Sequence, residues 1–203
     1  MTFEMKPLAC DPQRLRGLSE KLIVSHYENN YGGAVKRLNS IGSKLAELDY
    51  GSAPVFVVNG LKREELIATN SMILHECYFD SLGGDGRLST GDLHDRLAQD
   101  FGSLERWRVE FTAMGKALGG GSGWVLLVWS DRGNRLVNQW AADHTHALAG
   151  ATPILALDMY EHSYHIDYGA KAAAYVDAFM ENINWRGTAQ TYETCVGKLV
   201  QPF

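Results

Sequence analysis

The chain has 203 residues, of which 45% are apolar, so it can build one substantial core or two small domains that share an interface. Its formal net charge of -5 argues against nucleic-acid binding, because phosphate groups attract a basic surface. No apolar run approaches the length of about 18 residues that a membrane-spanning helix needs, so no membrane partner is expected.

Cysteine usage and the N-terminal segment favour a cytoplasmic protein. Cys10, Cys77 and Cys195 lie far apart, and an odd, scattered set does not form a disulfide framework. The N-terminal segment also lacks the charged stretch followed by an apolar stretch that is typical of a secretion signal.

The first part of the chain is predicted to be helical. Asp11 and Pro12 resemble a helix start, with an N-cap residue followed by proline at the first helical position. A stripe of apolar residues at helical spacing then leads to His26, and Gly32 and Gly33 are expected to weaken or bend this helix before it resumes.

A second amphipathic helix is predicted from about Lys62 to Asp80. His75 lies on its apolar face, as His26 lies on that of the first helix. A histidine on an inward face must find a partner there, because burying an unpaired polar group is costly.

The glycine-rich segment 83–86 is the predicted domain boundary, which divides the chain into residues 1–84 and 85–203. The elements predicted beyond it are a helix around 104–114 that ends at a glycine run, β-like runs at 124–130, 135–140 and 153–157, and a closing helix over 175–183. Asp131-Arg-Gly-Asn134 has the composition of a hairpin turn, so an antiparallel sheet is expected. The fold class is therefore α+β.

One cluster of potential ligands stands out, Asp158-Met-Tyr-Glu-His162, at the end of the last β-like run. An aspartate and a histidine four residues apart can converge there, and a carboxylate with imidazoles suits a first-row transition metal such as iron or manganese. For this motif alone, an exposed Asp–His pair at a helix start is an equally good interpretation.

Four segments resemble the iron/manganese superoxide dismutase family, and they occur in the family's order over nearly the whole chain. They are Ser25-His26-Tyr27 and Leu74-His75-Glu-Cys-Tyr-Phe79, which resemble the two helical ligand regions; Gly121-Ser-Gly-Trp124, which resembles the glycine-rich entry to the sheet; and Asp158 to Tyr168, which resembles the signature D-x-W-E-H-A-Y-Y-x-x-Y.

The resemblance implies the fold, the cofactor and the reaction. The family fold is an N-terminal helical hairpin followed by an α/β domain with a three-stranded antiparallel sheet. His26, His75, Asp158 and His162 would hold one iron or manganese ion per subunit between these parts, with iron favoured. The reaction would be the dismutation of superoxide to dioxygen and hydrogen peroxide.

Several positions around the expected ion differ from the family pattern. Ala34 replaces a tyrosine near the substrate channel, Asn30 replaces a histidine, and Tyr160 replaces the signature tryptophan. These changes favour an alternative function, a family member that binds metal with little dismutase activity and acts as a metal- or redox-responsive binding protein.

The resemblance also implies residues around the ligands and at a subunit interface. The hydrogen-bond partner of the solvent at the metal is expected to be His144, with His146 as the fallback, because Ser71 is too short; Trp124, Tyr160 and Asn30 complete this layer. A homodimer is expected, with a tetramer as the alternative, in which Glu161 bridges to the last histidine ligand and His165 contacts Asn30.

Overall fold

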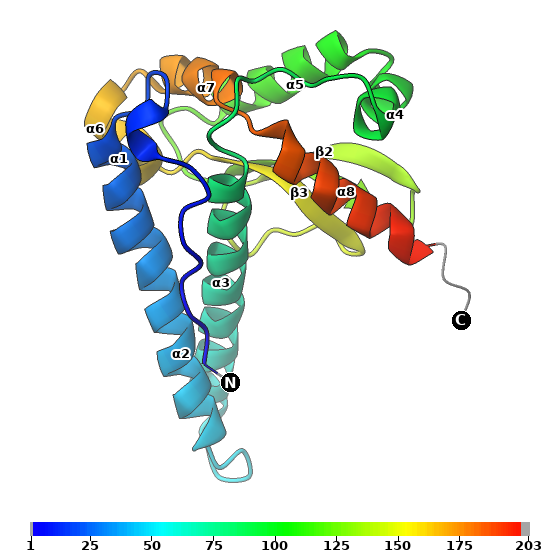
Figure 1. Ribbon diagram of the computed structural model, residues 1–203. Coiled ribbons are helices and arrows are strands. Elements are labelled where there is room, and N and C mark those ends of the chain that lie inside the picture. Colours follow the sequence, from blue (N-terminus) through cyan, green and yellow to red (C-terminus); the bar gives the residue numbers. More distant parts are fainter. Residues whose placement is uncertain (1, 200–203) are drawn as a thin grey trace.

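The computed structural model describes residues 2–199 and has a long helical hairpin followed by a three-stranded antiparallel sheet with helices around it (Figure 1). In chain order the elements are the 3-10 turn η1 (Pro12–Arg14), α1 (Glu20–Ser25), the π-helical turn η2 (His26–Tyr31), α2 (Gly32–Ala46), α3 (Val55–Asp80), α4 (Asp92–Phe101), α5 (Leu104–Ala117), β1 (Trp124–Ser130), β2 (Arg135–Ala141), β3 (Ala151–Asp158), the 3-10 turn η3 (Glu161–Ser163), α6 (His165–Tyr168), α7 (Ala172–Glu181) and α8 (Trp185–Leu199). This arrangement confirms the predicted fold class.

The first helix begins later than the sequence predicts. Asp11 does cap a helical turn, since its side chain accepts the Gln13 N–H, but this turn is only the short η1. Gly17 then adopts a φ of +71°, and Ser19 caps α1 by accepting the Leu22 N–H. The prediction of a continuous helix from Asp11 is therefore wrong. Leu15 and Leu18, the apolar residues between the two caps, are buried but lie in a loop.

The irregularity expected at Gly32-Gly33 lies one turn earlier, at His26–Tyr31, where the helix widens into a π-turn. Bonding in a π-turn runs from residue i to i+5, so one extra residue is accommodated. His26 and Tyr31, which are separated by this interval, are both buried, with exposed fractions of 0% and 1%. Both glycines continue the helix as the first residues of α2.

Helix α3 begins at Val55 rather than near Lys62. Its first residues, Val55 and Phe56, are 84% and 74% exposed, so they do not continue the inward-facing pattern from which the helix was predicted. Its end at Asp80 agrees with the prediction. Neither α3 nor any other helix among residues 2–199 is both long and apolar enough to cross a membrane.

The sheet confirms the predicted strands and the hairpin. Its order is β2-β1-β3, and both neighbours run antiparallel to the central, fully buried β1. Asn134 closes the β1–β2 turn with a φ of +45°. The open edge of β2 is capped from the helices: Asp100 accepts the Leu136 N–H, and Trp107 Nε1 donates to Asn138.

The C-terminal part contains three helices that the sequence analysis did not delimit, the short α6 and the longer α4 and α8. Helix α7 agrees with the predicted closing helix, but Ile183 lies after it and pairs with Leu82 in an isolated β-bridge. Trp185, at the start of α8, is packed edge-on against Trp107 of α5, so α8 completes the core on that side.

Candidate metal centre

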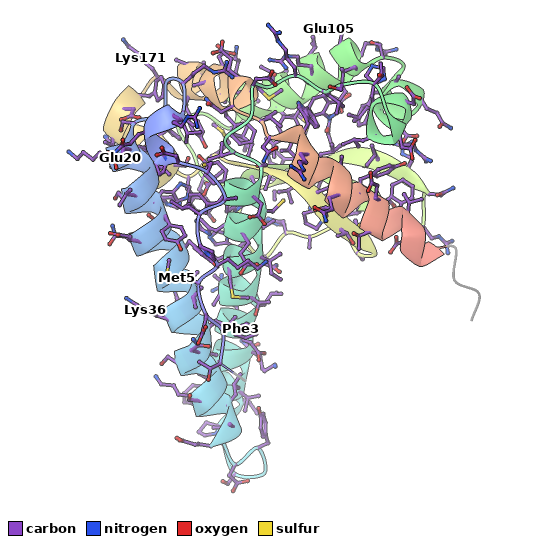
Figure 2. The ribbon with its side chains drawn as sticks, in the orientation of Figure 1. Phe3, Met5, Glu20, Lys36, Glu105 and Lys171 are labelled. Carbon is purple, nitrogen blue, oxygen red and sulfur yellow. The ribbon has the colours of Figure 1, made fainter. Side chains whose placement is uncertain are left out.

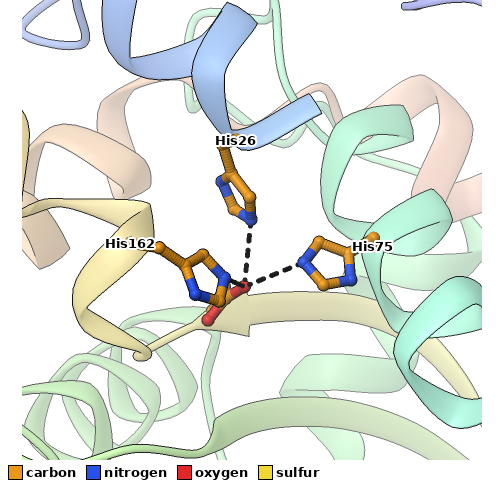
Figure 3. A group of neighbouring side chains, drawn as sticks. His26, His75 and His162 are labelled. Atoms are coloured by element: carbon orange, nitrogen blue, oxygen red, sulfur yellow. Dashed lines mark hydrogen bonds and ion pairs between the residues drawn. The ribbon is translucent and has the colours of Figure 1, made fainter. Parts of the chain in front are cut away.

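Four side chains from four separate elements meet where the helical hairpin joins the sheet. They are His26, the first residue of η2; His75 of α3; Asp158, the last residue of β3; and His162 of η3. Their ligand atoms all lie within 4.8 Å of one another, and Figure 3 shows the three labelled imidazoles pointing toward one carboxylate. The fold therefore brings together the residues that were predicted as ligands.

The spacing of the three imidazoles from Asp158 fits a single ion. Asp158 Oδ2 lies 3.1 Å from His26 Nε2, 3.2 Å from His162 Nε2 and 3.6 Å from His75 Nε2. Two ligand atoms that are each about 2.1 Å from an ion lie about 3.0 Å apart at a right angle and about 3.6 Å apart at 120°. The observed separations cover this same range.

His75 is held in the tautomer that a metal ligand needs. Its Nδ1 lies 2.6 Å from the carbonyl oxygen of Ser71, which can only accept, so Nδ1 carries the proton and Nε2 has a lone pair. That Nε2 is buried and has no hydrogen-bond partner within the described chain. A buried acceptor left without a donor is costly, and a cation at this lone pair would remove the cost. Ser71 thus orients the predicted ligand through its backbone carbonyl, and its hydroxyl oxygen lies 3.3 Å from the same Nδ1.

Burial sets the protonation states that ligation requires. Together with the neighbouring His26, it lowers the pKa of His75 to about 3. Burial also lowers the pKa of His26. Burial alone would raise the pKa of Asp158, but the charges and hydrogen bonds of His162 and His26 outweigh it, so the net pKa lies below its ordinary value. Buried neutral imidazoles and an ionised carboxylate are the forms that bind a metal ion.

The segment after β3 is folded so that Asp158 and His162 face one point. The Tyr160 N–H donates to Asp158 Oδ1 at 2.8 Å, which leaves Oδ2 for the histidines. The Ser163 hydroxyl lies 2.9 Å from the Asp158 carbonyl oxygen, and the Tyr175 hydroxyl lies 2.9 Å from the same oxygen. These hydrogen bonds fix the turn after β3, so Asp158 and His162 converge on one point and do not form an exposed pair at a helix start.

Aromatic rings line the ligands, and two of them are residues predicted to lie there. The Trp124 ring stands edge-on to His75, with centroids 5.3 Å apart. Tyr160 stacks on His162 at 5.4 Å and on His144 at 4.8 Å. The Tyr160 ring therefore contacts both His162 and His144, the residue expected to tune the site.

His144 lies beside the ligands, whereas His146 does not. The ring centroid of His144 is 6.2 Å from that of His75, and its Nδ1 lies 3.0 Å from Trp124 Nε1. An indole N–H can only donate, so Nδ1 of His144 accepts and the neutral ring carries its proton on Nε2. The sequence analysis missed Asn70, whose amide donates to the His144 carbonyl oxygen at 2.6 Å. The side chain of His146 is 49% exposed and lies near Asp143.

The positions that depart from the family pattern have unequal surroundings. Ala34 is buried in α2 with an exposed fraction of 7%, and Asn30 is half-buried and makes no side-chain hydrogen bond within residues 2–199. Among the phenols packed against the predicted ligands, that of Tyr31 stacks on His75 with ring centroids 6.3 Å apart, and that of Tyr78 lies against His26 with centroids 5.0 Å apart. The sequence spacing of Tyr31 from His26 did not predict this position, because it is the π-turn that brings both side chains into the core.

Glu161 and His165, predicted to act at a subunit interface, are exposed on η3 and at the start of α6. Neither side chain makes a hydrogen bond or an ion pair within the part of the chain that is described. The side chain of His162 between them is 27% exposed, against 0% for His26 and Asp158 and 1% for His75. One side of the ligand set thus opens toward this surface.

Comparison with known proteins agrees with the geometry. Residues 89–191 match the family model for the C-terminal domain of iron/manganese superoxide dismutases. An iron superoxide dismutase of Cupriavidus metallidurans is 72% identical, and the match covers 97% of this chain and 99% of that protein. A manganese superoxide dismutase of Halobacterium salinarum is 36% identical over 94% of this chain and 95% of its own length, and an iron superoxide dismutase of Aquifex pyrophilus is 35% identical over 90% and 87%. The chain therefore belongs to the iron/manganese superoxide dismutase family.

Proposed function

We propose that this chain is a superoxide dismutase and that its four convergent side chains hold one iron or manganese ion per subunit. The observation that carries the proposal is the meeting of His26, His75 and His162 around one oxygen of Asp158. Relatives named as iron and manganese superoxide dismutases, similar over nearly their whole length, support the same activity.

An ion held by these four side chains would supply one-electron redox chemistry, in which one superoxide is oxidised to dioxygen and a second is reduced and takes up two protons to leave as hydrogen peroxide. Three neutral imidazoles and one carboxylate suit a metal that alternates between charges of two and three, because the carboxylate helps to hold the higher charge. Burial of His26, His75 and Asp158 excludes bulk water from most of the ligand set. His162, the partly exposed member of the set, lies at the surface where Glu161 is also exposed.

Iron is the favoured metal. The relative that is 72% identical is named as an iron enzyme, whereas a manganese enzyme is 36% identical. The test is to remove the metal, reload the protein separately with iron and with manganese, and record superoxide consumption per bound ion. Consumption by the iron form above that by the manganese form supports the preference.

The alternative function is a family member that binds metal with little dismutase activity. Ala34 and Asn30 favour it, because neither side chain supplies the phenol or imidazole found at these positions in the family pattern. The same reloading experiment separates the two functions. Fully loaded protein that consumes no superoxide supports the binding protein and contradicts the enzyme.

His144 is proposed to tune the metal. With Nδ1 accepting from Trp124, the group that His144 has left to offer is an Nε2–H donor. Replacing His144 by alanine is expected to change the ratio of iron-supported to manganese-supported activity by roughly 10-fold or more, the usual range for outer partners of a metal site. The exposed His146→Ala variant is the matched control and should keep the wild-type ratio. An unchanged ratio in His144→Ala would reject the assignment.

A homodimer is proposed, with Glu161 of the partner subunit accepting a hydrogen bond from His162. Nε2 of His162 faces Asp158, which leaves Nδ1 for a carboxylate outside this chain, and Glu161 is exposed beside it. A reciprocal contact of this kind suits a two-fold interface, and it would also fix the ring of the ligand. His165 and Asn30 are proposed to meet at the same interface.

Replacing Glu161 by alanine, which removes the oxygen that would accept from His162, is therefore expected to raise the dimer dissociation constant and to speed metal loss, each by about 10-fold. Sedimentation velocity over a concentration series and metal analysis after dialysis measure the two effects. Glu105→Ala, at an exposed position on α5, is the control. A wild-type protein that sediments as a monomer with its full metal content would contradict the bridge.

We further propose a cytoplasmic location, which the odd, scattered set of cysteines supports. A division into domains 1–84 and 85–203 is also proposed. It is supported by the position of the hairpin before Gly84 and of the sheet with its helices after it.

A further inference from the structure

The N-terminal segment, residues 3–8, runs as an extended strap beside α2 and α3, and Figure 2 shows Phe3 and Met5 lying against this hairpin. The backbone of Phe3 pairs in both directions with the side chain of Asn39, at 2.8 and 2.9 Å. The Met5 sulfur lies over Gly32, where an added Cβ would come within 3.0 Å of it. The strap is therefore attached to the segment that follows the π-turn.

Lys6 is the residue through which the strap contacts the segments that carry the predicted metal ligands. Its N–H donates to the Tyr31 hydroxyl at 2.8 Å, and its carbonyl oxygen accepts from the Tyr27 hydroxyl at 2.7 Å. The Lys6 ammonium also forms an ion pair with Glu76. The two tyrosines thus bind the backbone of one residue, Lys6, through both its N–H and its carbonyl oxygen.

The Tyr31 hydroxyl joins three segments of the chain. It accepts from the strap at Lys6 and donates to Glu76 Oε1 of α3 at 3.1 Å, while Tyr31 itself is the last residue of η2. The π-turn that ends at Tyr31 begins at His26, and Glu76 directly follows His75. One buried hydroxyl therefore connects the two helical segments that carry these ligands.

The ring of Tyr31 also contacts His75 directly and His26 through Phe79. It stacks on His75 with a tilt of 27° and lies 6.1 Å from Phe79, centroid to centroid. Phe79 in turn packs against His26 with ring centroids 5.0 Å apart. A displacement of Tyr31 would therefore be passed to both ligands by close packing, since buried rings have no free space to absorb it.

We infer that Tyr31 is a positioning residue, whose hydroxyl sets the spacing of His26 and His75 by binding Lys6 and Glu76. The inference rests on the proposed ligand set. Metal sites require their ligands to be held within about 0.5 Å of the working geometry, and outer partners of ligands typically change metal affinity by about 10- to 100-fold.

The test is Tyr31→Phe, which keeps the ring and removes the hydroxyl. Wild-type and variant proteins are loaded with iron, and two quantities are recorded: the rate of iron release to a chelator and the visible absorption spectrum of the ferric form. Release about 10-fold faster, with a shifted spectrum, is expected. Glu76→Gln keeps an oxygen that accepts from Tyr31, so its release rate should stay within about 3-fold of the wild type, well below the effect expected for loss of an outer partner. Glu76→Ala should behave like Tyr31→Phe.

The matched control is Glu64→Gln, which breaks the Arg37–Glu64 ion pair between α2 and α3 at a distance from the ligands. It should alter only the urea midpoint. A wild-type release rate and spectrum in Tyr31→Phe would overturn the inference, as would a wild-type rate in Glu76→Ala if Tyr31→Phe does not fold. A spectral change in Glu64→Gln as large as that in Tyr31→Phe would also overturn the inference, because it would show that Tyr31 acts only through general stability. A wild-type protein that takes up no iron would instead reject the ligand set itself.

Discussion

Replacing His75 by alanine is expected to lower metal affinity by more than about 100-fold, beyond the range seen when only an outer partner is lost. The variant loses the one ligand nitrogen whose lone pair is fixed by a hydrogen bond on the other side of the ring. It also leaves the Asp158 carboxylate with two imidazoles. Elemental analysis after dialysis against a weak chelator measures the effect.

The control for this variant is His94→Ala. The side chain of His94 is 29% exposed, pairs with the adjacent Asp95 and is not among the four convergent side chains, so its loss should leave the metal content unchanged. A His75→Ala protein that keeps a full complement of metal under these conditions would show that the ion sits elsewhere.

Acidification is expected to destabilise the metal-free protein strongly between about pH 6.5 and pH 3. The pKa of His75 is lowered to about 3 in the folded chain, so below the ordinary histidine value the unfolded chain binds a proton that the folded chain does not. The free energy of unfolding therefore falls as the pH falls through this window. The lowered pKa of His26 acts in the same direction.

The size of the effect is several kcal/mol. One pKa unit corresponds to about 1.4 kcal/mol, so a shift from about 6.5 to about 3 contributes roughly 4–5 kcal/mol at the acidic end. The pKa of Asp158 is also lowered in the folded chain, so the free energy of unfolding falls further once the pH drops below the ordinary aspartate pKa, where the unfolded chain binds a proton that the paired carboxylate does not. Urea unfolding of metal-free protein at pH 7, 5.5 and 4 measures the slope. His75→Leu should flatten it, and a wild-type stability that does not change over this range would contradict the burial of neutral imidazoles.

The ligand set could be predicted from the sequence because its residues lie in recognisable local contexts. His26 and His75 interrupt apolar helical stripes, and Asp158 and His162 follow a β-like run at a short spacing. Their meeting in space could not be derived from those contexts, since it depends on how α3 packs against β3. The resemblance to a known family supplied that step.

Tyr31 and Asn70 were missed for physical reasons. A stripe drawn at the α-helical period places Tyr31 off the face of His26, and only the π-turn brings both residues into the core. Asn70 binds a backbone carbonyl of the 142–150 loop, and no sequence pattern reports a contact between a side chain and a distant peptide group. Helix α8 was also missed, although its buried residues Trp185, Thr188, Tyr192 and Cys195 recur at the helical spacing of three and four residues.

The most direct test of the proposed centre is a titration of metal-free protein with ferrous iron, in which superoxide consumption is recorded after each addition. Consumption should rise in proportion to bound iron and stop rising at one ion per chain. The His75→Ala protein, treated in the same way, should show no rise. Wild-type protein that binds one ion per chain and consumes superoxide no faster than the buffer would contradict the proposed function.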